Sequence, residues 1–118
     1  MKKVFFFTLL LTAFLTSCSS DSTDDLTIKP PSNVTYTSNV KAFIDQSCAT
    51  SGCHNAATNT AGLTLETYAQ VKAAFQNRNA LGRMESTTSP MPPVSKGGNL
   101  PSTTITVIKN WKDQGYLE

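Results

Sequence analysis

The sequence contains few of the residues that build metal clusters and catalytic sites. Its 118 residues include one histidine, three cysteines and one tryptophan. A structural zinc centre uses about four nitrogen or sulfur ligands, and the only cluster of such donors, Cys48, Cys53 and His54, supplies three. The sequence shows no substrate pocket and no general base, so it does not indicate an enzyme.

Long regular patterns are also missing. No run of alternating apolar and polar residues is long enough to indicate a β-sheet, and there are no internal repeats. The apolar run over residues 4–15 is shorter than the about 20 residues that cross a bilayer. Apolar residues elsewhere recur at helical spacing, so we predict an all-α protein with at most one domain.

The first residues have the form of a secretory signal. Met1-Lys2-Lys3 is a short basic start before the apolar run. Leu15-Thr16-Ser17-Cys18 resembles the lipobox of bacterial lipoproteins, in which the cysteine is acylated and becomes the first mature residue. We predict a signal peptide at residues 1–17 and acyl chains on Cys18 that anchor the exported protein to a membrane of the cell envelope, with its domain in the periplasm or on the cell surface. The alternative is an ordinary signal peptide with an incidental cysteine.

The charge balance gives no sign of a nucleic-acid partner. The chain has ten Lys and Arg and eight Asp and Glu residues. Removal of residues 1–17 takes away Lys2 and Lys3, which leaves eight charges of each sign. A neutral mature chain lacks the excess of basic residues on which binding to nucleic acid depends.

Two regions follow the predicted signal peptide. Residues 18–37 are rich in Ser, Thr, Asp and Pro and poor in large apolar residues, which predicts a flexible tether. Residues 38–118 contain the apolar residues of a compact domain.

Three short helices are expected in this domain. The first leads into Cys48, the second ends near residues 77–79, and the third ends at Gly115. Residues 81–84 stay unassigned, and residues 86–99 have the composition of a loop. The candidate caps are Ser38 or Asn39, Thr64 or Thr67, and Pro101 with Ser102 or Thr103; the apolar faces contain Val40, Phe43 and Ile44, then Tyr68, Val71, Ala74 and Phe75, then Ile105, Ile108 and Trp111.

Residues 48–54 contain two cysteines and the only histidine. A cysteine pair that ends in Cys-His is typical of c-type haem attachment, here with four residues between the cysteines where two are usual. Cys53 and His54 are consecutive, so their side chains diverge, which suits a ring edge and a ring centre better than one zinc ion. Gly52 can adopt the positive φ that a tight bend in the wider loop requires.

A second unusual segment is Ser89-Pro90-Met91-Pro92-Pro93. Prolines on both sides of Met91 fix backbone dihedral angles and exclude a helix. We therefore expect a stiff, extended loop that presents Met91.

These features occur in an order that resembles a known family, the small class I-type monohaem cytochrome c domains of exported bacterial proteins. The resemblance covers roughly residues 40–116. It depends on the loop ending in His54, on Gly62-Leu63-Thr64-Leu65 followed by Tyr68 and Val71, on Met91-Pro92-Pro93, and on a last helix with Ile105, Ile108 and Trp111 before Gly115.

The resemblance implies a helical domain around one covalent haem c. By it, Cys48 and Cys53 form the thioethers, His54 is the proximal iron ligand and Met91 the distal one. It also implies a one-electron carrier that exchanges electrons with a redox partner protein. Related cytochromes often have a proline in the loop after the proximal histidine, and this chain has none before Pro90, so the carbonyl that orients the imidazole is not predicted.

A haem would also complete the core. A domain of about 80 residues is near the size at which a core made of side chains alone is marginal. Met84 is a rival distal ligand, and Met91 has the alternative role of filling a gap in the core. Arg78, Arg83 and Lys96 are candidates for the haem propionates, with solvated surface positions as the default. The residues expected to pack on the haem are Leu63, Leu65, Tyr68, Leu81, Leu100 and Ile105.

Two other functional classes stay open. One is a haem-free lipoprotein interaction module closed by a disulfide between Cys48 and Cys53, as export permits. The other is a haem enzyme or gas sensor, which would need an open distal position in place of Met91.

Overall fold

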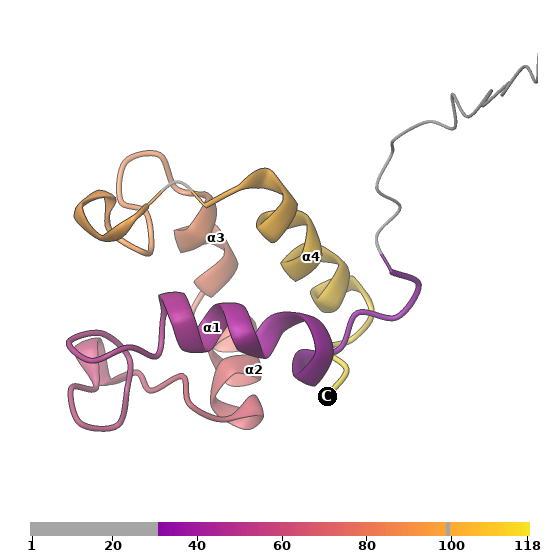
Figure 1. The fold of residues 1–118 in the computed structure, drawn as a ribbon, viewed down its shortest axis with the longest axis horizontal. Coiled ribbons are helices and arrows are strands. Elements are labelled where there is room, and N and C mark those ends of the chain that lie inside the picture. Colours follow the sequence, from indigo (N-terminus) through magenta and orange to yellow (C-terminus); the bar gives the residue numbers. More distant parts are fainter. Residues whose placement is uncertain (1–30, 99) are drawn as a thin grey trace, which may run out of the picture.

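Every regular element in the described part of the chain, residues 31–98 and 100–118 of the computed structural model, is helical (Figure 1). The prediction of an all-α domain is therefore confirmed. The predicted signal peptide, Cys18 and most of the predicted tether lie outside the described residues. The α-helices are α1 (Lys41–Ser47), α2 (Tyr68–Asn77), α3 (Ala80–Glu85) and α4 (Ser102–Asp113), and the short helical segments of other types are η1 (Tyr36–Val40), η2 (Thr60–Gly62) and η3 (Val94–Lys96).

The first helix starts earlier than the sequence predicts. Segment η1 continues directly into α1, and its cap is Thr35, whose hydroxyl accepts a hydrogen bond from the Ser38 backbone N–H at 3.2 Å. A second hydrogen bond closes the cap, because the side-chain oxygen of Asn39 accepts from the Thr35 N–H at 2.9 Å. Val34 and Tyr36, which the sequence places in the tether, are buried. The folded domain therefore begins before the predicted boundary at residue 38.

The second and third α-helices meet at an asparagine. Thr67, one of the two predicted caps, starts α2 with a capping box in which its hydroxyl and the Gln70 side chain bond each other's backbone N–H groups. Asn79 has a φ of 51°, a left-handed conformation that Asn tolerates better than most residues. The chain turns there and forms α3, which covers the segment that the sequence left unassigned.

Aromatic side chains fill one end of the domain. Trp111 of α4 is fully buried, and its ring lies edge-on to those of Phe75 and Tyr116, with centroids 5.6 and 4.9 Å away. Its indole N–H donates to the Leu117 carbonyl at 2.7 Å. We call this the aromatic cluster, which contains Tyr36, Tyr68, Phe75, Trp111 and Tyr116.

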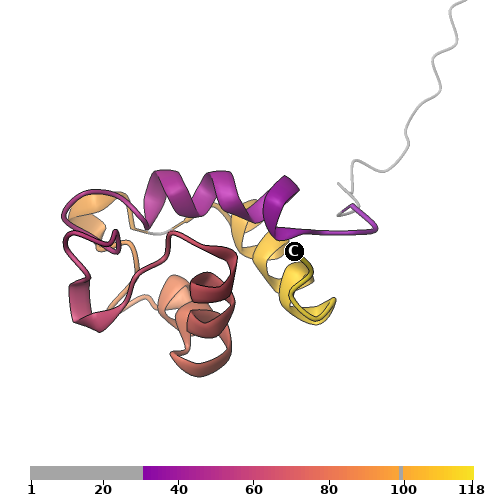
Figure 2. The ribbon, with the colours of Figure 1, turned by 90° about the horizontal axis from the view of Figure 1, so that it is seen from below.

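Hydrogen bonds tie the start of the described chain to its end in the same place. The Tyr36 N–H donates to the Leu117 carbonyl at 2.8 Å, and the Val34 N–H donates to the Gln114 side chain at 2.8 Å. Figures 1 and 2 show the C-terminus at one end of the continuous helix η1 to α1 and the long loops at the other. The loops that carry the predicted site are therefore separated from the aromatic cluster.

Candidate functional site

The cysteine loop folds back on the end of α1. The Cys48 and Ala49 N–H groups donate to the Ile44 carbonyl at 2.9 and 2.8 Å, which ends the helix. The His54 N–H then donates to the Cys48 carbonyl at 3.0 Å, so the loop closes on itself. Gly52 has a φ of 81°, as the sequence predicts, and its N–H donates to the hydroxyl of Thr58 at 3.0 Å. The four residues between the cysteines therefore form a closed turn that returns His54 to the side of Cys48.

The backbone orients the imidazole of His54. Its Nδ1 lies 3.1 Å from the Leu63 carbonyl oxygen, and a carbonyl can only accept a hydrogen bond, so Nδ1 is the protonated nitrogen in this pair. The Leu65 N–H donates to the His54 carbonyl at 2.8 Å, which holds the two segments together. Nε2 is left with a lone pair that can bind a metal. Leu63 thus supplies the orienting carbonyl that the sequence did not identify.

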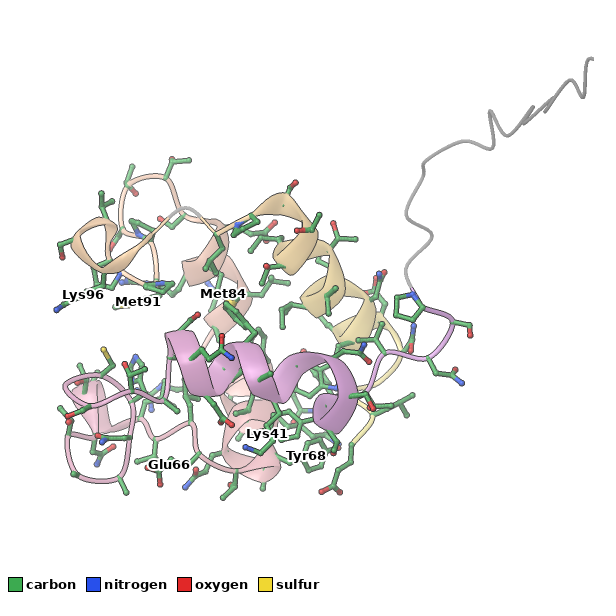
Figure 3. All side chains as sticks on the ribbon, viewed as in Figure 1. Lys41, Glu66, Tyr68, Met84, Met91 and Lys96 are labelled. Atoms are coloured by element: carbon green, nitrogen blue, oxygen red, sulfur yellow. The ribbon has the colours of Figure 1, made fainter. Side chains whose placement is uncertain are left out.

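The methionine loop is tied to α3. The Met91 N–H donates to the Arg83 carbonyl at 2.9 Å, and Pro90 and Pro92 on either side of Met91 are buried. Met84 lies in α3 and is 7% exposed. Figure 3 shows both methionines on the same side of α1.

A cavity of about 270 Å³ joins the two loops, and we call it the inner cavity. His54 and Cys48 line it from the cysteine loop, and Met91 lines it from the methionine loop. Its surface is mostly apolar. The full lining is Ile44, Cys48, His54, Ala61, Leu63, Phe75, Arg78, Ala80, Arg83, Met84 and Met91. One apolar cavity thus contains one imidazole, one thiol and two thioethers.

Cys53 lines a different cavity between the same two loops. This outer cavity has a volume of about 380 Å³, and Pro92, Lys96 and Leu100 line it together with Cys53. Its other lining residues are mostly polar or small: Gln46, Ser47, Thr50, Ser51, Gly52 and Gly97. The inner cavity is therefore the apolar one of the two, and the two cysteines lie in different surroundings.

Two residues expected beside the cofactor lie elsewhere. Tyr68 belongs to the aromatic cluster, where its hydroxyl donates to the Tyr116 carbonyl at 2.6 Å, and Figure 3 shows it towards the opposite end of α1 from Met91. Leu65 is buried in the core and lines neither cavity. In place of these two, the apolar wall uses Ile44 and Phe75. An apolar side chain in the sequence is expected to be buried, but its character does not indicate what covers it. The apolar character of Tyr68 and Leu65 therefore did not show whether these residues contact a cofactor or other side chains.

The other expected neighbours divide between the two cavities. Leu63 lines the inner cavity and Leu100 the outer one. Leu81 packs against the core, and Ile105 lines a further surface pocket beside Leu100. Met84 and Met91 both line the inner cavity, so the geometry leaves both methionines as candidate distal ligands.

Two arginines form the polar part of the inner cavity. Arg78 and Arg83 are solvent-exposed, which agrees with the surface positions expected by default, and both also line the cavity. The Arg78 side chain also donates to the Ala61 carbonyl at 3.1 Å. No local sequence signal indicates this bond, because it joins the end of α2 to a loop that depends on the tertiary fold.

The thiols of this site are free, and one has a shifted pKa. Burial raises the pKa of Cys48 to about 11, and the nearby Cys53 adds to the shift. Cys48 is therefore a neutral thiol at neutral pH.

Within residues 31–98 and 100–118, no three His, Cys, Asp or Glu side chains are grouped closely enough to hold a metal ion by themselves. In the same residues, no helix has the length and apolar content that a membrane span requires. Comparison with protein-family models, with curated proteins and with solved structures gives no match to this chain.

Proposed function

We propose that this protein is a monohaem c-type cytochrome that carries single electrons. One observation carries the proposal: His54 and Met91 line the same apolar cavity as Cys48, although 37 residues separate the two ligands in the sequence. Haem, when bound, supplies an iron that takes up and releases one electron between its ferric and ferrous states. The remaining roles belong to the side chains of the two loops.

Cys48 and Cys53 provide the covalent attachment. With haem bound, the two thiols would hold it through thioether bonds to its two vinyl groups, an addition that would need no net oxidation. Cys48 faces the inner cavity and Cys53 the outer one. The two sulfurs therefore act at different places on one elongated group.

His54 and one methionine provide the axial ligands. The Leu63 carbonyl holds Nδ1, so Nε2 is the nitrogen available to iron. We assign the distal position to Met91, because its N–H bond to the Arg83 carbonyl and its two buried neighbours, Pro90 and Pro92, fix its backbone. A thioether ligand in an apolar site favours the reduced form and raises the reduction potential.

The proposed carrier is not an enzyme, because a methionine in the distal position leaves no coordination site for a substrate. We further propose that acyl chains on Cys18 hold it to a membrane of the bacterial cell envelope, and that a redox partner protein exchanges electrons with it. These two proposals depend on the sequence of the first residues and on the resemblance to cytochromes.

A haem stain and an absorption spectrum test the proposal. The mature protein is produced in a bacterial host with a c-type haem attachment system and run on a denaturing gel. We expect haem colour that stays with the unfolded chain and a low-spin, six-coordinate spectrum. The matched control replaces both Cys48 and Cys53 by Ser and loses the covalent colour.

Two other outcomes point to the alternatives. A mature protein that carries no haem under these conditions and has its cysteines joined in a disulfide is the interaction module. A covalent haem with an open, high-spin iron that is unchanged in a variant lacking both Met84 and Met91 is the enzyme or gas sensor.

A further inference from the structure

The loop that carries the orienting carbonyl has an unusual backbone. Asn59, Ala61 and Gly62 have φ values of 46°, 57° and 68°. Left-handed conformations are unfavourable for residues with a side chain, and Ala lacks the polar side chain that eases them in Asn. Such a conformation persists only where surrounding contacts hold it. The segment just before Leu63 is therefore held by contacts from outside it, one of which joins the Thr60 N–H to the Cys53 carbonyl at 3.1 Å.

Arg78 provides the contact at Ala61. Its guanidinium Nη2 donates to the Ala61 carbonyl at 3.1 Å, across a sequence separation of 17 residues. Arg78 is the C-cap of α2, and its own N–H donates to the Ala74 carbonyl at 3.0 Å, which ties its backbone to the end of the helix. Within the loop, the Leu63 N–H donates to the Thr60 carbonyl at 3.2 Å. A bond at Ala61 thus restrains the short segment that leads, two residues later, to the Leu63 carbonyl that holds His54.

We propose that Arg78 is a positioning residue for the proximal ligand: its bond to the Ala61 carbonyl holds the left-handed loop, and the loop holds the Leu63 carbonyl against Nδ1 of His54. The proposal rests on the proposed function in treating His54 as the iron ligand. The hydrogen bond from Nδ1 raises the basicity of an imidazole ligand. Loosening of the loop therefore makes His54 a weaker donor and raises the reduction potential.

A charge effect has the opposite sign, which makes the two roles separable. Loss of a positive charge beside the haem lowers the reduction potential, because the ferric state has one more positive charge. Arg83 is the matched control, since it is also exposed and lines the same cavity, but donates no side-chain hydrogen bond to the loop. Arg78→Leu and Arg83→Leu both remove one charge and add no thioether to the cavity. Only the first variant removes the bond to the Ala61 carbonyl.

The experiment measures hydrogen exchange by NMR and the reduction potential of the mature protein. In Arg78→Leu we expect exchange of the Leu63 N–H and of the His54 Nδ1 proton to be faster by roughly fivefold, as loss of one hydrogen bond implies. In Arg83→Leu both rates stay at the wild-type value. The reduction potential of Arg78→Leu should lie above that of Arg83→Leu, and Arg78→Lys, which keeps a charge and a donor, should restore the exchange rates.

Equal exchange rates in the two leucine variants overturn the proposal, as does a reduction potential that falls equally in both. Arg78→Gln is the second variant if Arg78→Leu does not fold. Hydrogen exchange at Leu63 needs only the folded chain, so this part of the test gives an answer even if the wild-type protein carries no haem. Failure of the proposed function is thus distinguished from failure of the clamp.

Discussion

The two ends of the domain differ in how they are filled. At one end the aromatic cluster packs ring against ring, and Val34, Val71, Ile108 and Trp111 are almost completely buried. At the other end, two loops enclose the inner and outer cavities. Phe75 belongs to both, because its ring lies edge-on to Trp111 and also lines the inner cavity. Side chains pack closely at the first end, which we call the filled end. The second, which we call the hollow end, contains the two cavities.

The largest expected effect comes from removing a side chain of the aromatic cluster at the filled end. Trp111→Ala should destabilise the protein by about 3–5 kcal/mol, because it removes a fully buried aromatic side chain and leaves a cavity. This is a large part of the stability of a small domain. Urea denaturation followed by circular dichroism measures the loss, with and without haem.

Met91→Ala is the matched control at the hollow end. Its side chain already borders a cavity, so we expect a loss below about 1 kcal/mol in the haem-free chain and a changed spectrum in the haem-bound protein. Equal losses for Trp111→Ala and Met91→Ala in the haem-free chain would contradict the difference between the two ends.

The second prediction concerns the backbone of the methionine loop. A methyl group on Gly98 would lie 2.7 Å from the Pro92 carbonyl oxygen and 2.9 Å from the Val94 nitrogen, and these are backbone atoms that cannot turn aside. Gly98→Ala should therefore cost about 1–3 kcal/mol and shift the Met91 segment. Thermal unfolding and the visible spectrum of the haem-bound protein measure the two effects.

The third prediction concerns pH and the haem-free chain. The folded-state pKa of Cys48, about 11, lies above its unfolded value of 9.0, so the folded state favours the neutral thiol. The stability from this site is complete below pH 9 and is lost as the pH rises towards 11, by at most about 3 kcal/mol. Urea denaturation at pH 8 to 11 measures the loss. In Cys48→Ala the loss should be smaller but should not vanish, because burial also raises the pKa of Tyr36 and Tyr116. The same reduction is expected when haem is attached, because a thioether does not titrate.

The smallest expected effect concerns an ion pair that joins α3 to α4. Lys109 of α4 and Glu85 of α3 form an ion pair at 2.6 Å, and both side chains are exposed. Lys109→Ala should cost less than about 1 kcal/mol, and added salt should reduce even that difference. A cost above about 2 kcal/mol would show that the contact between α3 and α4 depends on this pair and not on apolar packing.

The sequence predicted the filled end better than the hollow end. Periodicity placed Val71, Phe75, Ile108 and Trp111 on apolar helix faces, and all four are buried. Local patterns suffice there because a helix buries its apolar face against whatever helix lies beside it. The same reasoning could not tell whether an apolar residue faces protein or a cavity, and Tyr68 is the example.

Helix α3 and the bond between His54 and Leu63 could not be read from the sequence for a related reason. Helix α3 has six residues with a glycine among them, and it starts at a left-handed Asn79 without a side-chain cap. Leu63 contributes a backbone carbonyl, which any residue at that position would have. Such features depend on how the chain closes in three dimensions, whereas the cysteine loop and the proline-framed Met91 could be recognised from residue type and order.

The most direct test of the account is the mass of the intact, denatured mature protein. A chain that carries haem through Cys48 and Cys53 should have the mass of the processed, acylated polypeptide plus one haem, and replacement of both cysteines by Ser should abolish the addition. A wild-type mass equal to that of the polypeptide alone, or lighter by the two hydrogens lost in a disulfide, would contradict the account.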